Sequence, residues 1–269
     1  MKNEFYIGYI NKLPKQTAKT IKKSIFVLIF VFVASGVVIA LHHQKVSNSK
    51  FELGQLSTIE GYYFNEPVPM IKLLEGKDIH GNHIFKSIPL VNYAKFGVEE
   101  LVGIYEEENK ISLQGKKVKI VGTYLYDDGK ALFELTKRAE SILEVSSLND
   151  PAIKEMIQPK IEKLGVNSIK GEIVDSKCYF GAMRPGFGKT HRACAVRCIS
   201  GGIPPVLAAT NYSGEVNYFL IRGSEKEAIN KEVLPYVAEP VRLTGELVKI
   251  DDWMVIYVNP KSGIERVKN

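Results

Sequence analysis

The stretch that decides the fold is KVKIVGTYLYDDGKALFEL, residues 117–135, in which strand-like runs lie on both sides of an Asp-Asp-Gly turn. Alternation of apolar and polar side chains indicates strands, and Asp-Gly between two such runs is a strong short-range signal of a β-hairpin. A second stretch, VRLTGELVKIDDWMVIYV at residues 241–258, has the same layout without the turn glycine. The sequence therefore predicts two related hairpins, one in each half of the chain.

An alternating strand that is interrupted by glycine precedes each hairpin. These strands are TIEGYYFNEP at residues 58–67 and SIKGEIVDSK at residues 168–177. Glycine permits the sharp coil that the long first strand of a small five-stranded barrel needs. The repeated pattern predicts a mainly β protein with two tandem OB-like β-barrels, and a different small β-sandwich or roll is the alternative.

The repeat also gives the domain boundaries. We expect the first OB-like domain, which contains no cysteine, at residues 45–145 and the second at residues 166–269. Residues 146–165 lie between them and include Asp150, Pro151 and a final Gly165. Because an Asp cap, proline at the first helical position and a terminal glycine mark helix ends, this segment is predicted to be a short helical linker.

An apolar segment near the N-terminus is predicted to cross a membrane. Residues 25–41 form an uncharged run of 17 residues, and a helix of that length nearly spans a hydrocarbon core of about 30 Å. The basic leader, residues 1–24, carries six lysines and one glutamate, so the positive-inside rule places it in the cytoplasm. We expect a signal-anchored, single-pass protein of a bacterial inner membrane with its C-terminal domains in the periplasm. A cleaved signal peptide is the alternative, with Val38 and Ala40 before the cut.

The charge distribution restricts the class of partner. The chain has a net charge of +6, but the leader's six lysines and single glutamate account for most of it. The exported part is therefore close to neutral and lacks the basic excess that a nucleic-acid partner requires. The expected partners are the membrane itself and another envelope or membrane protein.

All three cysteines lie in one segment of the second domain. Cys178 follows the glycine-containing strand, and the sequence HRACAVRC contains His191, Cys194 and Cys198. On a helix over residues 190–199 the last three side chains fall at i, i+3 and i+7 and therefore share one face. One imidazole and three sulfurs from two segments form a candidate metal site. Four nearby residues are candidates for supporting roles: Asp175, Lys177, Arg192 and Arg197.

Three chemistries remain open for this cluster. As a Cys₃His set it would bind zinc, copper or an iron–sulfur cluster. A disulfide between Cys178 and one cysteine of the helix would instead close a loop of about 20 residues and stabilise the fold. In thiol redox work, Lys177, Arg192 and Arg197 would lower the pKa of one cysteine and a second cysteine would resolve the mixed disulfide. Asp175 would orient His191 or a basic side chain, or would simply cap the end of its strand.

The cysteine motif resembles that of a family of uncharacterised bacterial exported or membrane-anchored proteins. The shared pattern is Gly-Glu-Ile/Val-Val-Asp-x-x-Cys-Tyr at residues 171–179, then His-x-x-Cys-Ala-x-x-Cys at residues 191–198, then Gly-x-Pro at residues 202–204. The resemblance covers roughly residues 166–262. It implies an exported OB-like fold and a functional cysteine cluster, but it names no substrate.

The sequence contains no Ser-His-Asp order, paired-carboxylate motif or dinucleotide fingerprint, so an ordinary hydrolase or dehydrogenase is not indicated. The predicted function is that of a membrane-anchored extracytoplasmic protein with a Cys/His site for metal binding or thiol redox work. The alternative is a non-catalytic envelope assembly or scaffold module whose cysteines form a structural disulfide. Whether the protein is an enzyme is left open by the sequence.

Overall fold

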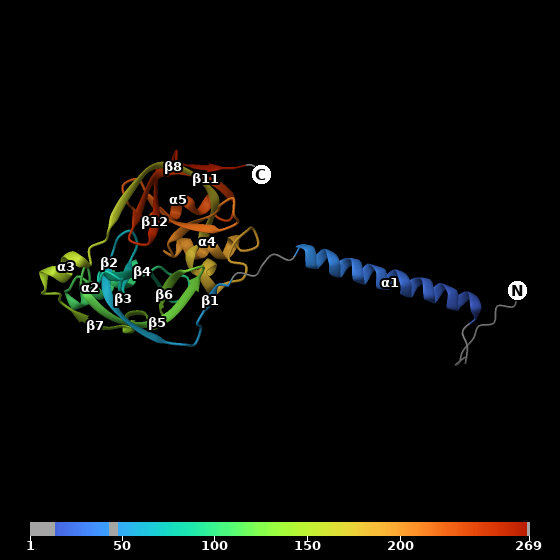
Figure 1. Ribbon diagram of the computed structural model, residues 1–269, viewed down its shortest axis with the longest axis horizontal. Helices are drawn as coiled ribbons and strands as arrows, with labels where there is room; N and C mark the ends of the chain where they lie inside the picture. Colours follow the sequence, from blue (N-terminus) through green and yellow to red (C-terminus); the bar gives the residue numbers. More distant parts are fainter. Residues whose placement is uncertain (1–13, 43–47, 268–269) are drawn as a thin grey trace. The chain divides into compact units, whose positions relative to one another are not determined.

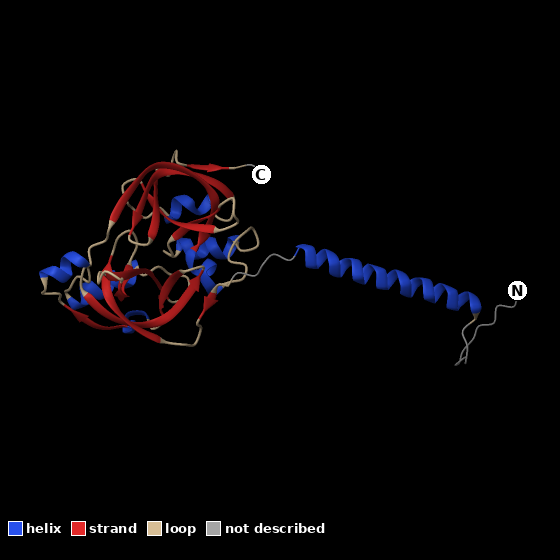
Figure 2. Ribbon diagram, in the orientation of Figure 1, coloured by secondary structure: helices blue, strands red, loops and turns tan. Residues whose placement is uncertain are grey.

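The computed structural model describes residues 14–42 and 48–267. The chain divides into an N-terminal segment, Met1–Val46, and a larger part, Ser47–Asn269. The first contains a single described helix, α1, and the second is a body of strands with short helices (Figures 1 and 2). The protein is therefore mainly β with an N-terminal helix, as predicted.

Helix α1 (Lys15–His42) contains the predicted apolar run and extends it toward the N-terminus. Residues Lys15–Leu41 are long and apolar enough to cross a membrane, and the 18-residue apolar window within them is not buried inside the protein. A cleaved signal sequence would form the same kind of helix. N-terminal sequencing of the mature protein distinguishes a retained anchor from a cleaved signal.

The first five-stranded unit closes on itself. Strands β5, β2, β3, β4 and β6 pair in that order, and β6 returns to β5, which forms a closed barrel. All pairings in this ring are antiparallel except the parallel pair β4–β6. The elements of this sheet and the helices near it are β1 (Lys50–Phe51), β2 (Ser57–Phe64), β3 (Met70–Lys77), β4 (His83–Asn92), α2 (Glu99–Asn109), β5 (Lys117–Asp127), β6 (Lys130–Leu135), η1 (Arg138–Ser141) and β7 (Ile142–Ser146).

The second sheet repeats this order of pairing. β8 pairs with β9, β9 with β10, β10 with β12 in parallel, β12 with β11, and β11 again with β8. Helices α5 and η3 lie between β10 and β11, at the position that α2 has in the first unit. The elements are β8 (Ile161–Asp175), η2 (Cys178–Ala182), α4 (Arg192–Ser200), β9 (Pro205–Thr210), β10 (Val216–Gly223), α5 (Asn230–Val233), η3 (Leu234–Tyr236), β11 (Pro240–Ile250), β12 (Trp253–Val258) and β13 (Ile264–Arg266).

Both predicted hairpins are confirmed, as β5–β6 and β11–β12. The first turns at Asp128 (φ 48°) and Gly129 (φ 78°), which is the pair of positive φ values that a two-residue hairpin turn favours. Gly122 and Gly245 occupy equivalent bends. A side chain at either would come within 2.0 Å of a carbonyl oxygen on the neighbouring strand. The close approach of strands explains the glycines.

The predicted helical linker is shorter than expected. Helix α3 covers only Pro151–Met156, with the Asp150 side chain accepting the N–H of Ala152 at 2.9 Å. Extension of the helix to Gly165 is wrong, because β8 already begins at Ile161 and pairs there with Ile250 of β11. Pro159 explains the break, since proline clashes with a preceding helical turn and disfavours helix in the residue before it.

The two sheets share a hydrophobic core in addition to the core that each one encloses. The shared core joins Phe64 and Leu125 of the first unit to Phe180 and Trp253 of the second. The indole N–H of Trp253 also donates to the Ser87 carbonyl oxygen at 2.7 Å. The two units therefore pack as one body, and the cysteine segment belongs to the core between them.

Candidate functional site

The cysteine segment leaves the end of β8 through an unusual turn. The Oδ1 atom of Asp175 accepts the backbone N–H of Cys178 at 2.8 Å, which fixes the start of η2. This element is a π-helical turn, in which the N–H of Met183 donates to the Cys178 carbonyl oxygen at 3.2 Å. Such wide turns are frequent at functional sites. Asp175 thus has the capping role that was one of its two predicted roles.

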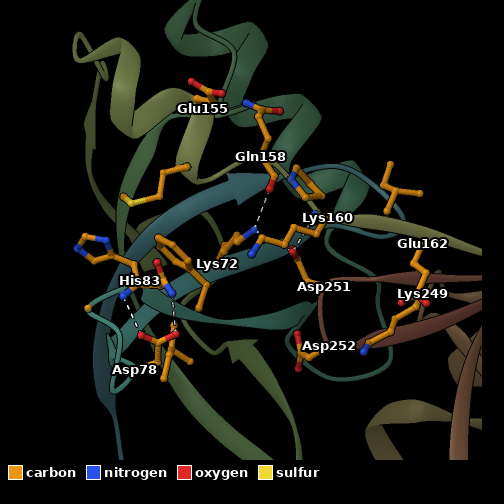
Figure 3. Close-up of a pocket in the computed structure, with 17 residues that line it drawn as sticks. Lys72, Asp78, His83, Glu155, Gln158, Lys160, Glu162, Lys249, Asp251 and Asp252 are labelled. Atoms are coloured by element: carbon orange, nitrogen blue, oxygen red, sulfur yellow. Dashed lines mark hydrogen bonds and ion pairs between the residues drawn. The ribbon is translucent and has the colours of Figure 1, made fainter.

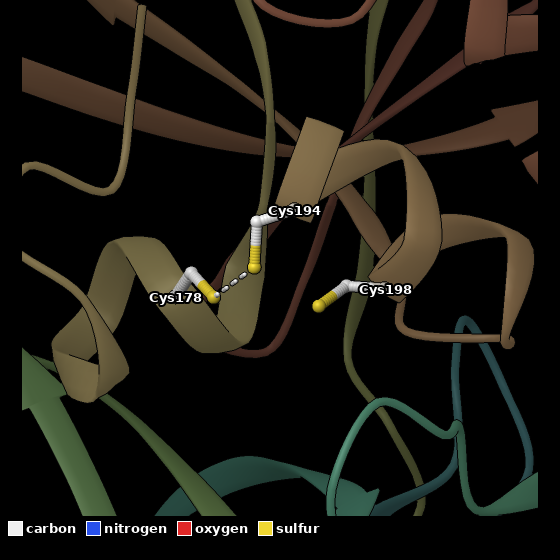
Figure 4. Close-up of side chains that lie close together, drawn as sticks. All are labelled: Cys178, Cys194 and Cys198. Carbon is white, nitrogen blue, oxygen red and sulfur yellow. Dashed lines mark hydrogen bonds between the residues drawn. The ribbon is translucent and has the colours of Figure 1, made fainter. Parts of the chain in front are cut away.

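Helix α4 supplies the other two cysteines, as predicted. His191 is its N-cap residue, and Cys194 and Cys198 lie one turn apart on the helix. The sulfur atoms of Cys178, Cys194 and Cys198 all lie within 4.8 Å of one another. Figure 4 shows Cys178 and Cys194 directed toward one another, with the Cys198 sulfur facing the same space. Three soft donors from two segments therefore converge on one point.

The three thiols are unbridged in this structure. The sulfurs of Cys178 and Cys194 are 4.0 Å apart, about twice the length of a disulfide bond. Cys178 and Cys198 are buried, whereas Cys194 is half-buried. The predicted structural disulfide is not formed here, and Cys194 is the sulfur with access to solvent.

His191 does not join the three sulfurs as their fourth ligand. Its ring nitrogen instead groups with the Asp175 carboxylate and the Cys178 sulfur, all within 4.8 Å of one another. The Nε2 atom of His191 is 3.3 Å from Oδ2 of Asp175, and both residues are buried. The predicted Cys₃His set is thus divided into a Cys₃ group and an Asp-Cys-His group that share Cys178. Asp175 does contact His191, as the second of its predicted roles required.

Lys177, the basic residue next to Cys178, binds acceptors in the first unit. Lys177 is buried and forms an ion pair with Glu134 of β6, and its Nζ also donates to the carbonyl oxygens of Asn92 and Ala94. All these partners belong to the first unit. A buried ammonium needs a full set of acceptors, and Lys177 finds them in the first unit, so its predicted effect on a cysteine pKa stays a prediction.

One arginine of α4 is bound by a carboxylate and the other is exposed to solvent. Arg192 forms an ion pair with Glu239 and donates to the Pro235 carbonyl oxygen at 3.2 Å. Arg197 is exposed. The guanidinium of Arg192 is thus occupied by a carboxylate, and its predicted effect on a cysteine pKa stays a prediction.

The cation that does contact a sulfur comes from the first unit. Nζ of Lys95 lies 3.2 Å from Sγ of Cys194. The Lys95 loop is held against the end of α4 by the hydrogen bond from Gly97 N–H to the Gly201 carbonyl oxygen at 2.9 Å. A side chain at Gly201 would come within 2.0 Å of the Lys95 carbonyl oxygen, so only glycine permits this approach. No local sequence pattern predicts this contact, because it joins residues 99 positions apart.

The cysteines differ in their tendency to ionise. A hydrogen bond from the Cys178 thiol lowers the pKa of Cys198, and the Lys95 charge acts in the same direction. The same hydrogen bond raises the pKa of Cys178, as do burial and the nearby Asp175 carboxylate. The pKa values of the two thiols are therefore shifted in opposite directions, and Cys198 is the one that ionises more readily.

We expect one thiol of the metal-free protein to ionise below the ordinary value of about 8.5. Because the pKa of Cys198 is lower in the folded protein than in the unfolded chain, its contribution to stability is complete above the unfolded value and is lost as pH falls through the folded value. Lys95→Met should raise this pKa, and Lys95→Arg should retain it. Ultraviolet absorbance of thiolate against pH measures the shift. Identical curves for wild type and Lys95→Met would contradict the assignment.

Ser176 allows a local test of packing beside the cluster. Its hydroxyl is fully buried, and among the described residues it has no hydrogen-bond partner. A buried hydroxyl without a partner destabilises a fold, so Ser176→Ala should leave the free energy of unfolding unchanged or raise it by about 1 kcal/mol. Urea denaturation measures this value. A loss of more than about 1 kcal/mol would show that the hydroxyl has a partner.

A polar cleft of about 980 Å³ lies elsewhere in the same body, between the β3–β4 hairpin, the α3 segment and the β11–β12 turn (Figure 3). Nζ of the buried Lys72 lies 3.0 Å from Oδ1 of Asp251 and 3.1 Å from the Gln158 carbonyl oxygen. Oδ1 of Asp251 also accepts the backbone N–H of Lys160 at 3.0 Å. The Lys72 ammonium of the first unit and the Asp251 carboxylate of the second therefore neutralise one another, and both also bind the backbone of the linker. These contacts at the base of the cleft hold the two units and the linker together.

Comparisons with known proteins give no family assignment. No protein-family model matches the chain, and no curated protein matches it in sequence. The resemblance of the cysteine motif to an exported bacterial family stays a prediction.

Proposed function

We propose that this chain is a membrane-anchored extracytoplasmic protein that binds a thiophilic metal ion through Cys178, Cys194 and Cys198. One observation carries the proposal: three unbridged sulfurs lie within 4.8 Å of one another. Two ligands of a tetrahedral zinc–thiolate centre are about 3.8 Å apart when each Zn–S bond is about 2.3 Å. The 4.0 Å separation of the Cys178 and Cys194 sulfurs is close to that value.

The ligand type favours zinc or copper(I). Thiolates are soft donors that select Zn²⁺, Cu(I) and iron–sulfur clusters. The chain contains three cysteines, and the usual iron–sulfur cluster has four cysteine ligands, so a single ion is the simpler occupant. Cys194 gives the ion access from solvent, and Lys95 at its edge partly offsets the negative charge of the thiolates.

Location and architecture belong to the same proposal. The basic leader and the apolar helix support a single-pass inner-membrane protein with its β units in the periplasm. The matching order of strand pairing supports two OB-like domains. A protein held at the membrane surface with a thiolate site is suited to receive a metal from, or deliver it to, another envelope or membrane protein.

Thiol redox work is the second candidate function. It is favoured by the half-buried Cys194, which lies next to Lys95 and 4.0 Å from the sulfur of Cys178. The Cys194 thiolate would attack a substrate disulfide, releasing one substrate thiol and forming a mixed disulfide; the Cys178 thiolate would then attack the Cys194 sulfur and release the second substrate thiol, leaving a Cys178–Cys194 disulfide. Reversible formation of that bond with a redox buffer, in protein that binds no metal, would support this function over the first.

The test of metal binding uses the full chain in detergent, reduced and kept free of oxygen. Competition with a chromophoric chelator measures the affinity for Zn²⁺ and for Cu(I). The proposal predicts that the protein removes either ion from the chelator and that a variant with all three cysteines replaced by serine does not. Equal competition by both proteins would contradict it.

A further inference from the structure

A second group of three possible metal ligands lies beside the three sulfurs. Asp175, Cys178 and His191 present an oxygen, a sulfur and a nitrogen within 4.8 Å of one another. None of the three residues is more than 4% exposed. Oxygen, nitrogen and sulfur donors of these residue types are the set that zinc accepts in proteins.

The distance between Nε2 of His191 and Oδ2 of Asp175 can be compared with that of a hydrogen bond and with that of two zinc ligands. A charge-assisted hydrogen bond between nitrogen and carboxylate has a length of about 2.7–2.9 Å. The observed separation of Nε2 and Oδ2 is 3.3 Å. Two ligands at about 2.1 Å from one tetrahedral zinc ion would be about 3.4 Å apart. The separation matches that of two ligands of a common ion and also lies within hydrogen-bonding range, while Oδ1 of Asp175 remains bonded to the Cys178 N–H.

Cys178 belongs to both ligand groups. A thiolate sulfur has several lone pairs and can bind two ions at once. One ion would then lie among the three sulfurs, and a second would lie between Cys178, Asp175 and His191. The shared sulfur would bridge them.

The charges of the ligands agree with two divalent ions. With all three thiols deprotonated for metal binding, the thiolates and the Asp175 carboxylate carry four negative charges. One divalent ion would leave two of these charges without a metal ion, and Lys95 beside Cys194 would offset only one of them, which is costly where the ligands are buried. The nearby buried cation Lys177 is already paired with Glu134. Two divalent ions would neutralise the ligand set.

From these observations we infer that the site holds two divalent ions bridged by the sulfur of Cys178, with Asp175 and His191 as ligands of the second ion. This inference rests on the proposed metal-binding function. It assigns Asp175 and His191 direct contact with metal, and it gives the centre a defined stoichiometry.

The first experiment is a zinc titration of the reduced full chain, with bound zinc counted by native mass spectrometry. Wild type is expected to bind two ions, and Asp175→Asn and His191→Gln are expected to bind one each. The asparagine variant keeps an acceptor for the Cys178 N–H, and unfolding by heat checks that both variants are folded. One ion in wild type, or two ions in both variants, would overturn the inference and leave the proposed function intact. No ion in wild type would overturn both.

A second measurement needs no variant. In Co²⁺-substituted wild type, the first equivalent should give a paramagnetic resonance signal, and the second should reduce the signal per cobalt, because a bridging thiolate couples the two spins. A signal that grows in proportion to both equivalents would overturn the bridge.

Discussion

Replacement of Cys198 by serine is expected to lower the affinity for Zn²⁺ by more than about a hundred-fold, because residues outside the ligand shell already cost 10–100-fold when mutated. Cys198 is buried and is the thiol whose pKa the cluster lowers, so it supplies the readiest thiolate. A serine hydroxyl does not ionise near neutral pH and is a poor ligand for soft ions. Chelator competition with the purified full chain measures the loss.

All three cysteines belong to the cluster, so no cysteine outside it can serve as a control. The control for this variant is therefore Ser176→Ala. It changes a buried side chain two residues from Cys178 without removing a sulfur. The control should bind zinc as wild type does. Retention of wild-type affinity by Cys198→Ser would show that the ion does not use this sulfur.

Replacement of Lys177 by methionine is expected to lower the free energy of unfolding by about 3–5 kcal/mol, because it leaves the buried Glu134 carboxylate without its partner. Both side chains are no more than 5% exposed, and they join the cysteine segment to β6 of the first unit. The same Lys177 ammonium holds the carbonyl oxygens of Asn92 and Ala94 beside Lys95. Denaturant unfolding measures the loss.

The matched control for Lys177→Met is Glu144→Gln, which removes the exposed Lys119–Glu144 ion pair at 3.0 Å. An exposed pair contributes no more than about 1 kcal/mol, so this variant should be close to wild type. Replacing Glu134 by leucine in the Lys177→Met background should recover part of the loss, since no buried charge is then unpaired. A loss below about 1 kcal/mol in Lys177→Met would show that the pair is not buried in solution.

The elements that sequence reasoning located are those with strong local signals. Asp128-Gly129 marks a hairpin because two positive φ values are needed there. The Asp150 cap and Pro151 mark the start of α3. The spacing of Cys194 and Cys198 predicted one face of a helix, and α4 confirms it. In each case the feature depends on backbone conformation, capping or helical spacing, which involve residues close together in the sequence.

The features that sequence reasoning missed depend on contacts between distant segments. β8 begins earlier than predicted because Ile161 pairs with Ile250, which no local rule indicates. Lys177 was expected to act on the sulfurs because it is their neighbour in sequence, but it is bound by Glu134. Lys95 contacts Cys194 only because the two sheets pack together. The site therefore depends on the first unit, which the sequence alone presented as a separate domain.

The most direct test of the central claim is the metal content of the full chain, purified without chelator and without oxygen, together with its count of free thiols. We expect near-stoichiometric zinc or copper, with all three thiols protected from alkylation until the metal is removed. Metal-free protein with freely alkylated thiols, or with a disulfide formed under the same conditions, would contradict it.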